Sequence, residues 1–448
     1  MPHILPVQDF VNLLDSRRNV ILNMTPEEAE ALLLADDPRA VSHIRGQFAL
    51  VVRKDKDVYM ARSIGRPMRY FLAKQTDGPL LIVAERIDEI FEELKRRGLE
   101  AQFHPSYTRM VPAHYVLRLQ LIGCPDPNPI YQRYFEPVRN HLPADLDLIG
   151  RAYIGALADV CQKWLMQIPA TEPVGVLFSG GIDSGSVFLV LYHLMLQMGM
   201  SPQRLKAFTL SVQDDSGNTG LSADAQQAQD FLHQLGLDLF LEVMDVPASA
   251  VDYREAIRVI EDYKPLDVEA AAMTLALCRQ IRRQYPEWRY LADGDGGDEN
   301  LKDYPIEENS ELTIRSVLNN PLLYHEGWGV DKIKHSLTYT GGMSRGHVRS
   351  YAPARLLGFQ AFSPYALPQV IEVSEGIPFI ELTQWNHEKL YALKGEIVKR
   401  GVKAITGMDM PVYPKRRFQH GAVQPRLQSR LFPGNELVYR QYFQSLYA

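Results

Sequence analysis

The chain has 448 residues, enough for two or three domains that each bury a core. Its 48 basic and 54 acidic side chains give a net charge of −6, so neither a nucleic acid nor a membrane surface is expected as a partner. The three cysteines, Cys124, Cys161 and Cys278, have no CxxC spacing, which argues against a disulfide framework or a cysteine metal site. No signal peptide is recognisable at the start, and we expect a cytoplasmic protein.

Short apolar segments separated by charged or glycine turns predict strands in the N-terminal part. The expected strands cover residues 48–52, 58–61 and 80–84, and a helical pattern over 87–97 and further strand material follow as far as residue 137. Strands with few helices between them indicate an α+β, antiparallel layered domain. We assign this first domain to residues 1–140.

Strands and helices alternate after a polar linker at residues 140–145. An amphipathic helix over 148–168 precedes four expected strands at 174–178, 207–212, 239–243 and 288–292, with helices over 187–198, 223–235 and 270–283 between them. Such alternation predicts an α/β domain with a doubly wound parallel sheet. We assign this second domain to residues 141–448 and expect its part beyond Tyr304 to be largely helical.

The segment from Val174 to Ser184 is the most informative in the chain, because a buried strand passes through a Ser-Gly-Gly turn directly into a helix. Glycines allow close approach of an anion, and the N–H groups at a helix start favour negative charge. A carboxylate at Asp183 suits such a turn only if Mg²⁺ lies between it and the phosphates. The alternative is a tight turn whose serines only cap the helix, but the strand–turn–helix context favours phosphate binding.

A second unusual segment, Asp293 to Glu299, interleaves four carboxylates with three glycines at the end of the fourth strand. The alternatives are a solvated acidic turn or a calcium loop, but the EF-hand spacing is absent. In a doubly wound sheet this turn would face the Ser179 turn across the strand ends. One carboxylate from each turn could then hold a single Mg²⁺ over the triphosphate of a nucleotide.

These two segments, in this order, resemble the synthetase domain of the asparagine synthetase family, which includes the β-lactam and carbapenam synthetases and the lasso-peptide cyclases. The first turn also resembles the pyrophosphate loop of the N-type ATP pyrophosphatases, which cleave ATP between the α- and β-phosphates. The resemblance runs from about residue 148 to residue 423. It implies ATP and Mg²⁺ as cofactors and adenylation of a carboxylate.

The resemblance also assigns roles to individual residues. Asp183 and Asp298 would be the Mg²⁺ ligands, and the ATP and pyrophosphate contacts would be Ser179, Gly180, Gly181, Asp183, Ser184 and Gly294. Asp295 would lie beside the acyl-adenylate and orient or deprotonate an amine, which requires a raised pKa. Lys415, six residues before Gly421, matches a lysine that stabilises charge on the α-phosphate and acyl oxygens. The alternative for residues 415–417 is a basic surface run.

The acceptor side departs from the family pattern. Residues 358–365 resemble a Gly-X-Glu-X-Arg-X-Pro-Phe stretch, with Gln360 in place of the acid and Phe362 in place of the arginine. Both changes remove charge, so an aspartate-like substrate and a true asparagine synthetase are not expected. Tyr351, Arg345 and Arg349 are candidates for an acceptor pocket, with a helical surface role as the equal alternative.

Residues 45–51, 61–67 and 84–87 resemble the second half of the family's glutamine amidotransferase domain. A working glutaminase of that kind uses a cysteine at position two, whereas this chain has Pro2 and no cysteine before Cys124. We therefore expect a truncated, Ntn-like domain without glutaminase activity. It would be a structural remnant or a docking surface.

The sequence as a whole predicts an ATP-dependent, AMP-forming ligase that joins a carboxylate to an amine or ammonia, in specialised biosynthesis. The substrates would be small molecules or peptides, the amine could belong to the same molecule, and a homodimer or a pathway partner protein is compatible with the chain. One alternative is a sulfur-transfer type of carbonyl activation, against which the absence of a CxxC motif counts. The other is a non-catalytic nucleotide-binding scaffold, which need not keep Asp183, Asp298 and Lys415.

Overall fold

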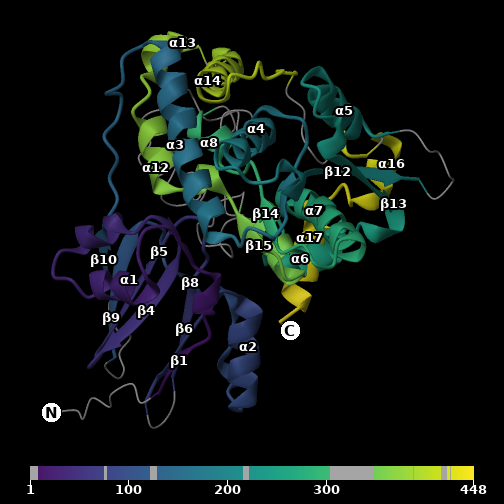
Figure 1. Cartoon of the computed structure of the whole chain (residues 1–448). Coiled ribbons are helices and arrows are strands. Elements are labelled where there is room, and N and C mark those ends of the chain that lie inside the picture. Colours follow the sequence, from purple (N-terminus) through teal and green to yellow (C-terminus); the bar gives the residue numbers. More distant parts are fainter. Residues whose placement is uncertain are drawn as a thin grey trace. The chain divides into compact units, whose positions relative to one another are not determined.

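The structure is a computed structural model, and it describes residues 9–74, 78–121, 129–214, 221–302, 347–386, 388–414, 421–423 and 425–447. Within these residues the chain divides into two compact units. The first comprises the residues up to Glu136 together with Tyr447, and the second comprises those from Pro137 to Leu446. Figure 1 shows the elements of both units.

The first unit contains two four-stranded sheets, with strand orders β1-β7-β6-β8 and β10-β9-β5-β4. Every pair is antiparallel, as the expected antiparallel layered domain requires, except β1 with β7, which is parallel. The strands are β1 (Asp9–Asn12), β4 (Ala49–Lys54), β5 (Asp57–Arg62), β6 (Arg69–Ala73), β7 (Leu80–Ala84), β8 (Arg109–Met110), β9 (Tyr115–Gln120) and β10 (Ile130–Arg133), and the short strands β2 (Val20–Ile21) and β3 (Gly46–Gln47) form a separate pair.

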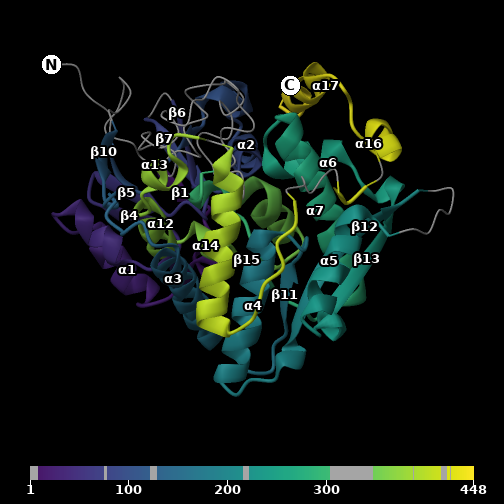
Figure 2. The ribbon, with the colours of Figure 1, turned by 90° about the horizontal axis from the view of Figure 1, so that it is seen from above.

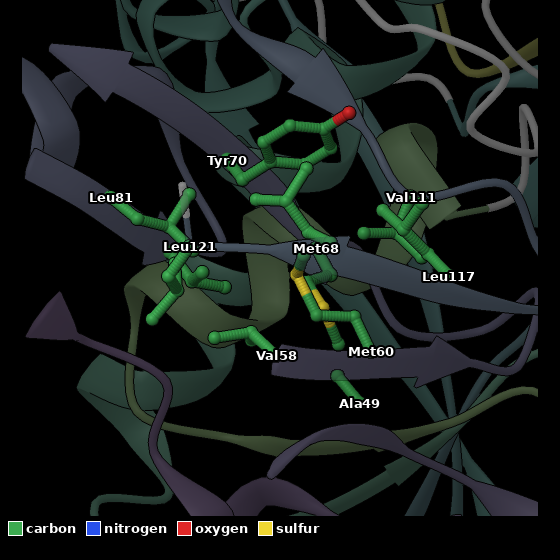
Figure 3. Packing of buried hydrophobic residues seen from close by; sticks show 11 residues of the cluster. Ala49, Val58, Met60, Met68, Tyr70, Leu81, Val111, Leu117 and Leu121 are labelled. Atoms are coloured by element: carbon green, nitrogen blue, oxygen red, sulfur yellow. The ribbon is translucent and has the colours of Figure 1, made fainter. Parts of the chain in front are cut away.

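The two sheets pack face to face, and a helix covers each outer face. Alternate residues of β7 point in opposite directions, and both faces are buried. Leu81 and Val83 join the core between the sheets, whereas Leu80 and Ile82 pack towards α2 (Ile87–Arg96). The inter-sheet core is shown in Figure 3. Because α1 (Pro26–Leu33) contacts β4 and β5, the layers run helix, sheet, sheet, helix.

The second unit is built on a five-stranded sheet in which all four pairings are parallel, with the order β13-β12-β11-β14-β15. The strands are β11 (Val174–Leu177), β12 (Leu205–Gln213), β13 (Leu241–Pro247), β14 (Tyr290–Ala292) and β15 (Gln360–Phe362). This confirms the predicted α/β domain with a parallel sheet. The order reverses between β11 and β14, and ligands of such sheets bind at the carboxyl ends of the strands at that point.

Helices flank this sheet. They are α3 (Leu146–Gln167), α4 (Ile182–Gln197), α5 (Ala223–Gln234), α6 (Tyr253–Ile260), α7 (Pro265–Gln284), α8 (Gly297–Asn300), α11 (Ala352–Leu356), α12 (Pro368–Glu375), α13 (Phe379–Thr383), α14 (Lys389–Thr406), α16 (Pro425–Leu431) and α17 (Glu436–Ser445). Right-handed crossovers place α4 and α5 on one face and α7 on the other. Among the described residues, no helix combines the length and apolar character needed to span a membrane.

Helices α3 and α14 cross with their backbones in contact, and both lie beside α4 in Figure 2. Two glycines face each other at the crossing, and a Cβ added to Gly401 would lie 2.2 Å from the carbonyl oxygen of Gly150. The buried face of α14 also carries Leu390, Lys394 and Ile397. The crossing therefore determines how closely Lys394 approaches α4.

We expect Gly401→Ala to lower the free energy of unfolding by about 2 kcal/mol, because overpacking at the crossing exceeds the gain in helix propensity. Chemical denaturation followed by circular dichroism measures the difference. Gly155→Ala in α3 is the matched control, since its added Cβ would meet only a side-chain methyl of Ile405 at 3.8 Å. The control should be neutral or slightly stabilising, and equal stability of both variants would contradict the close crossing.

Candidate functional site

The sheet register brings the two unusual segments to the same level. Val176 of β11 is paired with Ala292 of β14. Ser179 and Asp295 each follow three residues later, at the carboxyl ends of adjacent strands. The site is therefore at the reversal point of the strand order, as expected for this type of sheet.

The Ser179 turn is held from both sides. Gly180 has φ +70°, and a Cβ there would lie 2.8 Å from the backbone nitrogen of Ala228 in α5. The side chain of Gln227 donates to the Ser179 carbonyl at 3.4 Å. The Ser179 hydroxyl accepts from the N–H of Gly181 at 3.3 Å and lies 3.2 Å from the Ser184 hydroxyl. Hydroxyl and N–H groups thus gather at the start of α4, where the helix dipole favours an anion.

The acidic turn packs directly on the first turn of α4. A Cβ at Gly294 would lie 2.6 Å from the backbone nitrogen of Ser184, and one at Gly297 would lie 2.2 Å from Oδ1 of Asp183. Gly296, with φ +104°, is the N-cap residue immediately before α8, and Asp298 lies in the first turn of that helix. The glycines between the acids therefore permit a contact that side chains would prevent.

Lys394 lies between Asp183 and Asp298, the two carboxylates that the family resemblance assigns to Mg²⁺. Its ammonium group donates to Oδ2 of Asp183 at 2.6 Å and to Oδ1 of Asp298. Its side chain is only 1% exposed. Since both carboxylates converge on one positive centre, their placement fits a cation.

These groups line a cavity of about 240 Å³ in the second unit. Asp183, Asp224, Asp293, Asp295, Asp298 and Glu299 contribute six carboxyl groups, and Arg349 and Lys394 contribute two cations. The lining carries more acidic than basic groups, so a metal ion bound there would favour the entry of a polyphosphate. The charge balance therefore supports a divalent cation, although no group of three or more metal-ligating side chains occurs among the described residues. Two carboxylates suit Mg²⁺, which commonly takes its remaining ligands from phosphates and water.

Burial and mutual repulsion raise several pKa values here. The pKa of Asp295 is raised to about 6 by burial, against the lowering effects of the Ser350 hydrogen bond and of Arg349. Burial, and then the neighbouring Asp295, raise the pKa of Asp293 well above its usual value. Asp293 is held in place, because its oxygens accept from the N–H of Asp295 at 3.0 Å and the Ser363 hydroxyl at 2.9 Å. A carboxyl such as Asp295 suits proton transfer near neutral pH.

Arg349 lines the cavity, and its charge acts on Asp295 and Glu299 of the acidic turn. Its guanidinium donates to Oδ1 of Asp267, which is 1% exposed, with both nitrogen–oxygen distances at 2.8 Å. The cavity lining includes Arg349 and the neighbouring Ser350. Of the acceptor candidates from the sequence, Arg349 thus reaches the cavity, Tyr351 is buried outside the lining, and Arg345 lies outside the described residues.

Asp262 is another buried carboxyl group, outside the cavity lining, and it should make stability depend on pH. Burial, followed by the charge of Asp267, raises its pKa to about 7. The folded protein therefore retains a proton that the unfolded chain releases near pH 4, at roughly the ordinary aspartate pKa. The stabilisation is complete below the unfolded pKa and is lost as pH rises through the folded one.

Asp262→Asn should remove this dependence and raise stability above the folded-state pKa by about 2 kcal/mol. Its Oδ1 accepts from the N–H groups of Tyr263 and Lys264, which an asparagine carbonyl can also do. Denaturation midpoints across the pH range measure the effect. The exposed Asp230, replaced by asparagine, is the control, and parallel pH profiles for both variants would contradict the prediction.

The structure places most of the predicted site residues around one cavity. Ser179, Gly181, Asp183, Ser184, Gly294, Asp295 and Asp298 line it, and Gly180 lies in the same turn without lining it. Lys415 lies outside the described residues. Its neighbours Tyr413 and Pro414 line the cavity, and a Cβ at Gly421 would lie 1.7 Å from Oδ1 of the cavity residue Asp224. The roles of all these residues remain predictions.

Sequence reasoning missed Lys394 and placed no function on α14. The signal was present, because Lys394 falls between Leu390 and Ile397 on the buried face of an amphipathic helix. A lysine at such a position is seldom fully buried unless it is paired.

Sequence reasoning also missed β15. Within this strand Phe362 stacks on Trp164 at 4.5 Å between ring centroids, so Phe362 belongs to the core rather than to the cavity lining.

The fold and the paired turns define an α/β domain of the kind that binds nucleotides at its strand ends. The sequence profile of the asparagine synthase family matches residues 164–387, half of the chain. The chain therefore belongs to the asparagine synthase family. Lys394 and Lys415 both lie beyond the matched residues.

Two fungal proteins are similar to this chain. Amidase chyE of Penicillium rubens is 26% identical over 285 residues, which cover 59% of this chain and 40% of that protein. Amidase chry2 of Gibberella zeae is 26% identical over 288 residues, with the same shares of 59% and 40%. The chain thus matches less than half the length of these curated relatives.

Proposed function

We propose that the chain is an ATP-dependent amide-bond ligase that adenylates a carboxylate, releases pyrophosphate, and transfers the acyl group to an amine or ammonia. One observation carries this proposal. Asp183 and Asp298, from two different turns, both contact the Lys394 ammonium beside the Ser179 turn. Family membership supports ATP-dependent amide formation. Neither ordinary core packing nor a simple strand-to-helix turn requires two carboxylates to contact one ammonium group.

In the first half-reaction a substrate carboxylate oxygen attacks the α-phosphorus, and the bond to the β-phosphate oxygen breaks. The Ser179 turn and the start of α4 bind the departing pyrophosphate, with Gly180, Gly181, Ser184 and Gly294 keeping the backbone close. Mg²⁺ held by Asp183 and Asp298 would neutralise phosphate charge. Lys394, and by family resemblance Lys415, would supply positive charge where the α-phosphate becomes more negative.

In the second half-reaction an amine attacks the acyl carbon and AMP leaves. The amine loses a proton as the amide forms, and Asp295 is our candidate for accepting it. Its position in the cavity and its raised pKa support this role. Arg349 and Ser350 would orient the substrate on the same side.

We further propose that the first unit derives from a glutamine amidotransferase domain and contributes no glutaminase reaction. Its helix–sheet–sheet–helix layering supports an Ntn-like origin. Residues 1–123 contain no cysteine that could act as the nucleophile. The unit would then serve as a scaffold or a docking surface.

The test is to incubate the full chain with ATP, Mg²⁺ and pooled carboxylates and amines from its host, and to assay AMP and pyrophosphate. AMP that depends on one acid pool and is lost in Lys415→Ala would support the ligase and lead to its substrate. ADP formation would overturn the chemistry at the α-phosphate. Nucleotide binding without turnover in any pool would favour the scaffold.

Two further arms address the remaining alternatives. Glutamine is offered as the nitrogen source, and stimulation by it would overturn the assignment of the first unit. Because both relatives are named amidases, an amide pool is also offered without ATP. Amide cleavage that needs no ATP would show that this chain acts in the hydrolytic direction.

A further inference from the structure

A buried tyrosine connects the two elements that carry the predicted metal ligands. Tyr365 is 0% exposed, and it lies in the turn after β15. Its hydroxyl oxygen is 2.6 Å from Oγ of Ser186 in α4. The Ser186 hydroxyl donates its single proton to the Asp183 carbonyl at 2.8 Å, so the tyrosine hydroxyl is the donor to Ser186. A chain of two hydrogen bonds therefore joins Tyr365 to the backbone of Asp183.

The backbone and Cβ of Tyr365 contact the acidic turn and α8. The carbonyl of Tyr365 accepts from the side-chain amide of Asn300, the last residue of α8, at 2.9 Å. A Cβ on Gly296 would lie 3.1 Å from the Cβ of Tyr365, so the start of α8 also packs against it. Tyr153 of α3 stacks on the ring, with 5.5 Å between centroids and 22° between planes. The ring therefore has little freedom to shift.

We propose that Tyr365 is a positioning residue that fixes the separation of Asp183 and Asp298 through its hydrogen bond to Ser186. This inference rests on the proposed function, in which those two carboxylates hold the metal. The link depends on the Tyr365 hydroxyl, which is the group that contacts Ser186. Removing it would leave the fold of the turn intact but loosen α4 relative to α8.

The test measures metal binding rather than turnover alone. Mn²⁺ is the probe, and its dissociation constant is measured by electron paramagnetic resonance on the full chain with a non-hydrolysable ATP analogue. We expect Tyr365→Phe to weaken Mn²⁺ binding about 5- to 10-fold, a typical coupling of about 1 kcal/mol for a neutral buried hydrogen bond. Ser186→Ala should do the same, and the double variant should be no weaker than either single variant.

Tyr439→Phe is the matched control, because it removes another fully buried tyrosine hydroxyl, on α17, that has no hydrogen-bond partner within the described structure. It should leave the Mn²⁺ constant unchanged, and equal weakening in the control would overturn the positioning role. An unchanged constant in Tyr365→Phe would also overturn it.

Asp183→Asn separates this inference from the proposed function. If it abolishes Mn²⁺ binding while Tyr365→Phe does not weaken it, only this inference fails; if it leaves binding intact, the proposed metal site itself is wrong.

Discussion

Replacing Lys394 by methionine should reduce adenylation by about 10²- to 10³-fold, as loss of a preorganised charge aimed at the reacting group does in other enzymes. Methionine keeps the length and apolar body of the side chain but removes the ammonium that contacts Asp183 and Asp298. Two carboxylates would then face each other with only metal to neutralise them. Carboxylate-dependent exchange of labelled pyrophosphate into ATP measures this half-reaction without knowledge of the amine.

Lys399→Met is the matched control, since it removes an exposed lysine from the same helix. The control should exchange pyrophosphate at the rate of the unaltered chain. Excess Mg²⁺ should restore little activity to Lys394→Met if the ammonium acts on the phosphates. Full rescue by Mg²⁺ would instead show that Lys394 only neutralises the acidic pair, and unimpaired exchange at ordinary Mg²⁺ would remove it from the mechanism.

The second unit could be anticipated from sequence because its signals are local. Long apolar patterns place α3 within two residues of its predicted ends, and they place the end of α4 within one residue, although α4 begins five residues before its predicted start. The strand β15 could not be anticipated, because three residues acquire strand geometry only by pairing with β14. The expected strand at 239–243 begins instead with a 3₁₀ turn, so β13 starts at Leu241.

In the candidate site, too, residues in local sequence motifs could be predicted, whereas residues brought in by tertiary packing could not. Two segments with strong local chemistry revealed Asp183 and Asp298, because phosphate turns and acid clusters are rare in sequence. Lys394 comes from a helix 96 residues beyond Asp298, and only tertiary packing brings its ammonium to the pair. Arg349 was an acceptor candidate from the sequence, but its contact with Asp267, across 82 residues of chain, was not foreseen. Long-range partners of this kind leave a weak local signal.

Replacing Gly297 by alanine should abolish measurable adenylation, although the change adds a single methyl group. The new Cβ would lie 2.2 Å from Oδ1 and 2.4 Å from Cγ of Asp183, distances that real side chains do not tolerate. Asp183 cannot simply rotate away, because its other oxygen is held by Lys394 at 2.6 Å. Either α8 moves outward with Asp298 or the carboxylate leaves the cation, and both changes separate the predicted metal ligands.

The expected signature of Gly297→Ala is loss of Mn²⁺ binding and of pyrophosphate exchange, with a stability loss of about 1–3 kcal/mol from overpacking. Gly434→Ala is the control, because an added Cβ there meets no atom within 4 Å. A folded Gly297→Ala protein that still binds Mn²⁺ with the nucleotide analogue would contradict the argument. In that case the acidic turn could not lie as close to Asp183 as the proposed metal site requires, and the second ligand would have to be sought elsewhere on the cavity wall.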